Sequence, residues 1–134
     1  MLIRRKVQVK AIITEQFRQG LIERLREARL QVEISQQQLE YQARKYLPDL
    51  EGKDPARAEA FRRRLDRQKQ KREELRTKLT AELTAAEKLE IGAEYEQAPI
   101  EGLVEINIGD NLSEKLQAAE VVVRDGVVVD IRHD

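Results

Sequence analysis

The sequence predicts an α+β fold in which a long antiparallel helical hairpin, a coiled coil, is inserted into a small antiparallel β-domain. Three observations predict it. Residues 2–13 alternate between apolar and polar side chains, residues 14–91 follow helical periods, and Asp125-Gly126 joins two runs of valine near the end. Both ends of an antiparallel hairpin emerge at one place, so the N- and C-terminal segments can share one sheet.

The composition favours solvated helices over a large core. Of 134 residues, 37% are charged and 4% are aromatic. Lys and Arg number 25, as do Asp and Glu, so the whole chain has no charge bias toward nucleic acid or a membrane. It has no cysteine, its start is charged, and no apolar run approaches the ~20 residues of a membrane span. We therefore expect a soluble, cytoplasmic protein with no membrane partner.

The first helix is expected to follow the strand 2–13, with Thr14 as a plausible N-cap. Apolar and small residues then recur in alternating steps of four and three, which is typical of a coiled-coil seam. The steps fall on Leu21, Leu25, Ala28, Val32, Ser35, Leu39, Gln42 and Tyr46. Pro48 disfavours helical backbone at the residue before it, so the helix is expected to end near Tyr46-Leu47.

The second helix begins at a strong signal, because Asp54 can cap it and Pro55 suits the first helical position. Ile91-Gly92 resembles a glycine C-cap. The predicted seam comprises Phe61, Leu65, Gln68, Arg72, Leu75, Leu79, Glu82, Ala86 and Leu89. The helices, about 32 and 36 residues long, would fold back on each other through a turn at 47–54.

Polar residues interrupt both seams, at Ser35, Gln42, Gln68, Arg72 and Glu82. Two explanations remain open. Partner helices complete a hairpin that is marginal alone, or the stems of Lys and Arg side chains cover the gaps.

The C-terminal part predicts a strand at 103–108, a short helix at 112–118 capped by Asn111, and a hairpin of strands 120–124 and 127–132. Together with residues 1–13, residues 92–134 would form a discontinuous domain of about four strands and one short helix; residues 14–91 would form the arm. Both faces of the last hairpin are partly apolar. Either the short helix and the base of the arm cover them, or a second copy does, which makes a homodimer possible.

Three segments of the sequence resemble the YlqD family of bacterial proteins. They are KVQVKAIITE at 6–15, GLVEINIGDNL at 102–112 and VVVRDGVVVDIR at 121–132, with a charged helical stretch between the first two. The resemblance implies a soluble bacterial protein that contains a coiled coil. It supplies no catalytic residues.

The predicted turn carries three carboxylates, Asp49, Glu51 and Asp54, and is a candidate partner-binding tip. Their placement is similar to the arms of transcript-cleavage factors, which help to hold Mg²⁺. Those factors begin with the helical hairpin, however, whereas here a strand comes first. The simpler explanation is an acidic turn in which Asp54 acts as a cap.

Residues 57–78 contain ten basic and four acidic side chains, which makes them a candidate nucleic-acid or ribosome contact. The same charges could pair with the first helix or form a solvated face. The basic residues chosen as candidate nucleic-acid contacts are Arg62, Arg63, Arg64, Arg67 and Lys71.

No group of residues predicts an enzyme. His133 is the only histidine and lies next to the last residue, where a frayed tail is expected, and a zinc site lacks its usual ligands. We therefore predict no cofactor, no metal and no catalytic residue. The favoured hypothesis is a structural protein whose arm binds an unknown protein partner, and the alternative is a nucleic-acid-binding module.

Overall fold

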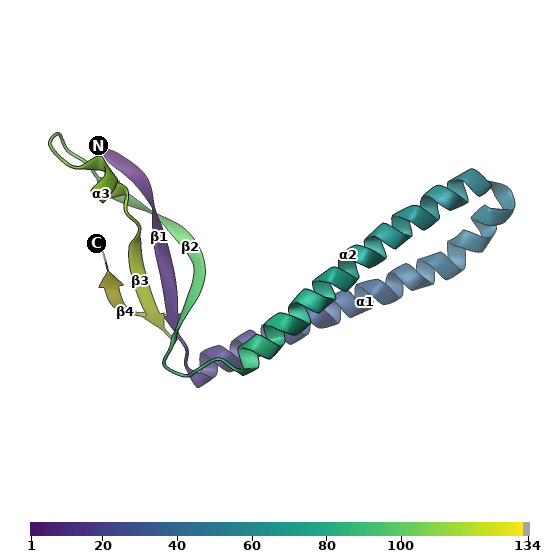
Figure 1. Ribbon diagram of the computed structural model, residues 1–134, viewed down its shortest axis with the longest axis horizontal. Helices are drawn as coiled ribbons and strands as arrows, with labels where there is room; N and C mark the ends of the chain where they lie inside the picture. The colour runs from purple at the N-terminus through teal and green to yellow at the C-terminus, as the bar shows by residue number, and fades with distance from the viewer. Residues whose placement is uncertain (133–134) are drawn as a thin grey trace. The chain divides into compact units, whose positions relative to one another are not determined.

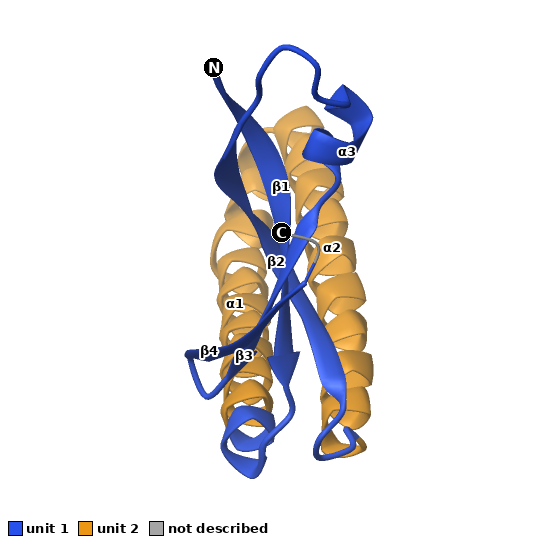
Figure 2. Ribbon diagram, turned by 90° about the vertical axis from the view of Figure 1, so that its left-hand side faces the viewer, with its two compact units in different colours: residues 1–19, 89–134 blue, residues 20–88 orange. Residues whose placement is uncertain are grey.

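The computed structural model describes residues 1–132, so His133 lies outside the described part of the chain. The chain divides into two compact units. The first comprises residues 1–19 together with the chain from residue 89 on, and the second comprises residues 20–88 (Figure 2).

The first unit is built on a four-stranded sheet in the order β2-β1-β3-β4 (Figure 1). Its strands are β1 (Leu2–Ile12), β2 (Glu94–Glu105), β3 (Ala119–Arg124) and β4 (Val127–Arg132). The expected fold class is confirmed, with one difference in the sheet. The β1–β2 and β3–β4 pairs are antiparallel, but β1 and β3 are parallel, so the sheet is mixed. After β2 the chain turns back through α3, so β3 runs in the direction opposite to β2. Strand β3 then pairs with β1 on the side away from β2, and the two run parallel.

Strand β2 starts nine residues earlier than predicted and ends at Glu105 instead of residue 108. This stretch contains Pro99, which is accommodated because β2 is an edge strand and its register against β1 shifts between Val7 and Val9. Gly102 lies opposite Arg5, where a Cβ would come within 2.9 Å of the Val7 side chain. Glycine therefore permits the close approach of β2 to β1.

The turn between β3 and β4 is hydrogen-bonded to the residue that precedes the first helix. Asp125 and Gly126 both have positive φ, 48° and 82°, as a two-residue hairpin turn requires. The Thr14 hydroxyl donates to the Asp125 carboxylate at 2.6 Å and accepts from the backbone N–H of Phe17 at 3.0 Å. Thr14 is thus the predicted N-cap, and it also fixes the hairpin turn.

The core of the first unit is small. Val122 is its most buried large side chain, only 1% exposed, and Ala11, Ile13 and Ala119 are buried as well. The Phe17 and Tyr95 rings are tilted against each other with centroids 5.4 Å apart. Asn111 caps the short helix α3 (Leu112–Leu116) as predicted, and this helix ends two residues early.

Charged side chains from all four strands meet in a network. Lys10 lies 3.2 Å from Glu120 and 4.0 Å from Glu94, and Arg132 contacts the same two carboxylates at 3.7 and 2.7 Å. The hydrogen bonds from Arg132 lower the pKa of Glu94, and the bonds to Glu94 and Asp130 raise the pKa of Arg132. The network therefore connects β4 to β2 although β1 and β3 separate them.

We predict that Arg132→Gln raises the pKa of Glu94 toward the usual range of a glutamate. A depressed folded pKa contributes stability that is present above the usual Glu range and is lost as the pH falls through the folded value. The measurement is an NMR titration of the Glu94 carboxyl carbon. The control is Arg124→Gln, because Arg124 makes no bond to Glu94 within residues 1–132; an equal response to both variants would contradict the assignment of the shift to Arg132.

The second unit contains most of two antiparallel helices, α1 (Glu15–Lys53) and α2 (Pro55–Glu87). We call this pair the helical hairpin. Its interface buries Ile22, Val32 and Leu39 of α1 and Ala58, Leu65, Leu79, Leu83 and Ala86 of α2. Gln42, Tyr46, Leu75 and Glu82 were wrongly placed in the interface, since all four are exposed.

Helix α2 ends at Glu87, four residues before the predicted Ile91-Gly92 cap. Gly92 has a positive φ of 93°, as expected, but its N–H bonds to Ile13 O at 2.8 Å instead of closing a helix. Ile13 N in turn bonds to Ala93 O. Pairing with the end of β1 therefore replaces the last helical turn.

Two of the polar interruptions in the seam bond to each other across the helical hairpin. The guanidinium of Arg72 donates from Nε to the Ser35 hydroxyl at 2.6 Å and from Nη1 to the Gln68 carbonyl at 3.2 Å. Beside them, Gln36 bonds to Glu73 and Arg76 to Glu33. These bonds form a polar layer that gives the polar side chains of the interface hydrogen-bond partners and fixes the register of the two helices.

We predict that Ser35→Ala lowers the free energy of unfolding by about 1–2 kcal/mol, since it removes the acceptor of a half-buried charged donor. The measurement is urea denaturation followed by circular dichroism at 222 nm. Gln37→Ala on the exposed side of the same helix is the control and should change stability by no more than about 0.5 kcal/mol. Equal effects of the two variants would show that the layer does not stabilise the helical hairpin.

Candidate functional site

A single non-helical residue closes the helical hairpin. The predicted turn over 47–54 is wrong, because α1 continues through Pro48 to Lys53. Asp54 N donates to Leu50 O at 2.8 Å, and the Asp54 carboxylate accepts from Arg57 N at 3.2 Å. Asp54 therefore caps α2 as predicted while its own N–H completes the last turn of α1.

Pro48 lies inside α1, five residues before its end. A proline has no N–H to give to the carbonyl four residues earlier, and its ring crowds that carbonyl. The local preference against helix is overridden because the residues around Pro48, Leu47 and Leu50 among them, are half-buried in the helical hairpin.

We predict that Pro48→Ala raises the free energy of unfolding by about 2 kcal/mol, because it restores one helical hydrogen bond. Pro55→Ala is the matched control, since a proline at the first helical position gives up no needed bond. Both are measured by urea denaturation. A gain of the same size from Pro55→Ala would contradict this account of Pro48.

The three acidic candidates do not converge. Asp49 pairs with Lys53 at 3.3 Å within α1, Glu51 pairs with Arg62 across the helical hairpin, and Asp54 caps α2. Among residues 1–132, no three His, Asp or Glu side chains gather into a group that could hold a metal ion. Each carboxylate at this end thus has a structural partner of its own.

The basic candidates divide into two sets. Arg62 contacts Glu51 and Glu59, and Arg63 contacts Glu59, so both guanidinium groups are engaged. Within the described chain, the side chains of Arg67 and Lys71 make no ion pair or hydrogen bond, and neither does that of Arg57, which was not among the candidates. Arg64 has no carboxylate partner there and lies over the Phe61 ring, 5.4 Å from its centroid.

We call Arg57, Arg64, Arg67 and Lys71 the basic stripe. Steps of seven, three and four place them on one face of α2. Arg76, by contrast, points to Glu33 of α1. The structure thus separates cations that hold the helical hairpin together from cations that remain available on its outside.

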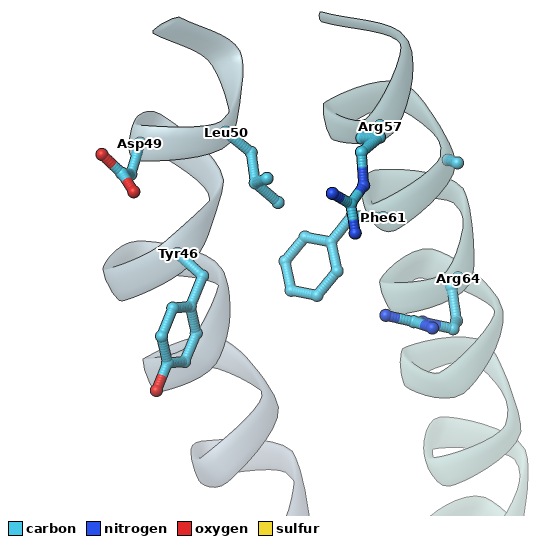
Figure 3. Close-up of a pocket in the computed structure, with 7 residues that line it drawn as sticks. Tyr46, Asp49, Leu50, Arg57, Phe61 and Arg64 are labelled. Atoms are coloured by element: carbon cyan, nitrogen blue, oxygen red, sulfur yellow. The ribbon is translucent and has the colours of Figure 1, made fainter. Parts of the chain in front are cut away.

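The basic stripe begins at a pocket of about 470 Å³ between the ends of the two helices (Figure 3). Leu50 and Phe61 point toward each other from opposite helices, and Arg57 and Arg64 extend from α2 toward the same space. The lining residues are Tyr46, Asp49, Leu50, Arg57, Ala60, Phe61 and Arg64. Two aromatic rings and two guanidinium groups therefore share one concave surface.

Sequence reasoning missed Tyr46 and Phe61 as site residues because it assigned both to the seam. Beyond Leu39 the inward-facing residues of α1 are Ala43, Leu47 and Leu50, so the steps become four, four and three. This shift changes the phase of the seam. As a result, Tyr46 is 49% exposed. The two consecutive four-residue steps from Leu39 to Leu47 are the feature of the sequence that could have indicated this.

A second concave surface of about 400 Å³ lies along α1 and shares Tyr46 with the first. Its lining residues are Ile34, Gln37, Gln38, Tyr41, Gln42 and Tyr46, none of them charged. Leu30, Ile34 and Tyr41 lie on one face of α1 and are exposed; we call them the apolar band. At 100° per residue, Ile34 points about 160° away from the buried Val32, so the band lies opposite the interface with α2.

These features define the class of protein: an α+β chain whose long helical hairpin is inserted between the strands of a small mixed sheet. The family model described as YlqD protein matches residues 1–132, and the chain belongs to this family. The predicted resemblance is confirmed.

Two further comparisons agree. "Uncharacterized protein YlqD" of Bacillus subtilis (strain 168) is 26% identical over 132 residues, which is 98% of each chain. A crystal structure of a protein of unknown function from Synechococcus sp. WH 8102 has the same fold, with a TM-score of 0.87 at 22% identity over 98% of this chain and 94% of that chain. Neither the family's description nor that of either relative names an enzymatic activity. Within residues 1–132, neither long helix has a stretch apolar enough to cross a membrane.

Proposed function

We propose that the protein is a non-enzymatic interaction protein of the cytoplasm, and that its helical hairpin binds a protein partner. The observation that carries this proposal is the apolar band. Tyr41 is 57% exposed and Ile34 is 39% exposed, on the face of α1 that lies opposite its interface with α2. Single exposed apolar residues are common, but a row of them beside an uncharged groove is typical of a binding surface.

The chemistry of the band favours a helical partner. Leu30, Ile34 and Tyr41 follow steps of four and seven, so they form a row along α1 against which the apolar face of an amphipathic helix can pack. The glutamines beside them, Gln37 and Gln38, can bond to a partner without the desolvation cost of a charge. A helix laid along this groove would bury the band and part of Tyr46.

A photo-crosslinking amino acid at Tyr41 should capture the partner in cells, whereas the same amino acid at Glu23, on the same face of α1 but outside the groove, should not. Ile34→Glu should weaken capture at least tenfold, because it exchanges the burial of an isoleucine, worth about 1.5–3 kcal/mol, for a buried charge. Glu23→Gln is the control substitution.

Each outcome bears on the proposal. A product of twice 15.6 kDa would identify the partner as a second copy and establish the homodimer that the sequence allows. Equal capture at Tyr41 and Glu23, or unchanged capture by Ile34→Glu, would rule out the apolar band as the binding surface.

A second candidate function, nucleic-acid binding, is favoured by a separate observation. The basic stripe has no carboxylate partner within residues 1–132, although the neighbouring Arg62 and Arg63 do. Cations held apart from anions on the outside of a helix are suited to phosphates.

A further inference from the structure

We infer that the pocket of Figure 3 binds an unstacked base of single-stranded RNA, and that the basic stripe carries the phosphates that follow it. This inference rests on the second candidate function and gives it a site and a ligand. Apart from Tyr46, which lines both concave surfaces, it uses other residues than the apolar band, so either proposal can fail without the other.

The pocket has the size and the lining that a base requires. Its volume of about 470 Å³ lies within the range of about 300–1,000 Å³ that is usual for small-ligand pockets. Phe61 supplies a ring, and the guanidinium of Arg64, 5.4 Å from the centroid of that ring, supplies a second flat surface. The half-exposed Tyr46 ring lines the same space. Bases stack on aromatic rings and on guanidinium planes alike.

The basic stripe has the length of a short run of nucleotides. Arg57 and Lys71 are fourteen residues apart, which is about 21 Å along a helix. Arg64 and Arg67 lie between them, so four basic side chains follow one another along this face of α2. Asp66 and Glu74 lie beside Arg67 and Lys71, but within residues 1–132 neither carboxylate pairs with a basic side chain of the stripe, and Glu74 bonds to Gln70 at 3.2 Å. Four phosphate contacts are therefore geometrically available.

The acidic groups around the pocket are accounted for. Glu59 is held by Arg62 and Arg63, and Glu51 by Arg62. Asp49 remains at the rim, bonded to Lys53 at 3.3 Å. The lining side chains thus have two positive charges against one negative charge, which favours an anionic ligand.

Three features favour single-stranded RNA over the alternatives. A paired base in a duplex cannot enter a pocket between two helices, whereas a splayed base of a single strand can. An acidic peptide would satisfy the arginines but would leave the rings without a matching flat group. Finally, the Tyr46 phenol and the Asp49 carboxylate can bond to a ribose 2′-hydroxyl, which DNA lacks, while the carboxylate repels a phosphate.

The test is fluorescence anisotropy of the full chain with a labelled twelve-nucleotide single-stranded RNA of mixed sequence, at 50–200 mM salt. We expect binding at 50 mM salt, with a salt slope of about −3 for four phosphate contacts. Single-stranded DNA of the same sequence and duplex RNA should both bind more weakly. Phe61→Leu should weaken binding roughly tenfold, because it keeps an apolar side chain and removes the stacking surface. Phe61→Tyr should restore it.

The matched pair Arg64→Gln and Arg63→Gln separates a site from a general charge effect. Both variants remove one positive charge from adjacent positions, but Arg63 already pairs with Glu59 at 3.3 Å. Arg64→Gln should weaken binding at least fivefold and flatten the salt slope by about 0.7. Arg63→Gln should change affinity by less than twofold. Circular dichroism of every variant checks that the helical hairpin is intact.

Several results would overturn the inference. They are absence of binding at 50 mM salt, equal losses in Arg64→Gln and Arg63→Gln, and equal affinity for RNA, DNA and duplex. A photo-crosslinker at Ala60 that captures a protein and no RNA in cells would also overturn it and would assign the pocket to a protein partner. Loss of capture at Tyr41 has no bearing on the RNA result, so the two failures are distinguishable.

Discussion

Strand β1 pairs along its length with β2 on one side and along half its length with β3 on the other. Both partners lie more than 80 residues further along the chain, so the first compact unit exists only when the two ends of the sequence meet. The pairs Ile13–Gly92 and Met1–Ile106 extend this closure beyond the strand itself. The sheet in turn sets where α1 begins, because Thr14 directly follows β1 and is bonded to the turn between β3 and β4.

The second unit depends on the very short connection between its two helices. Two helices of 39 and 33 residues are joined by Asp54 alone. The last turn of α1 and the first turn of α2 therefore determine which faces of the two helices pack together. The interface buries apolar residues along its length, from Ile22 and Ala86 at one end to Leu65 and Ala58 near Asp54, and the Ser35–Arg72 bond lies in the middle. Near Asp54, the change of phase of the seam in α1 leaves Tyr46 outside the interface. The same packing that closes the interface therefore opens the pocket beside Phe61.

Local chemistry in the sequence was sufficient for the caps and the hairpin. Thr14, Asp54-Pro55, Asn111 and Asp125-Gly126 each act within three residues, and each was placed correctly. The errors lie where a distant segment decides. Pairing with β1 makes a strand of the segment around Pro99 and removes the last turn expected of α2. The packing of the half-buried Leu47 and Leu50 keeps the chain helical at Pro48. Likewise, which arginines are paired depends on the register of α1 against α2, which no periodicity in one helix reveals.

The central position of β1 has a consequence for biosynthesis. This strand leaves the ribosome before its partners, which follow about 80–120 residues later; at about 5–20 residues per second that is a delay of several seconds or more. The two helices involve mostly local contacts and can form during that time, and their antiparallel pairing brings the waiting strand close to where β2 will emerge. Until then the apolar face of β1 is uncovered, and its arginines and lysines, which alternate with Val7 and Val9 or lie nearby, keep the nascent strand hydrated. Translation thus orders the assembly of this protein from the middle outward.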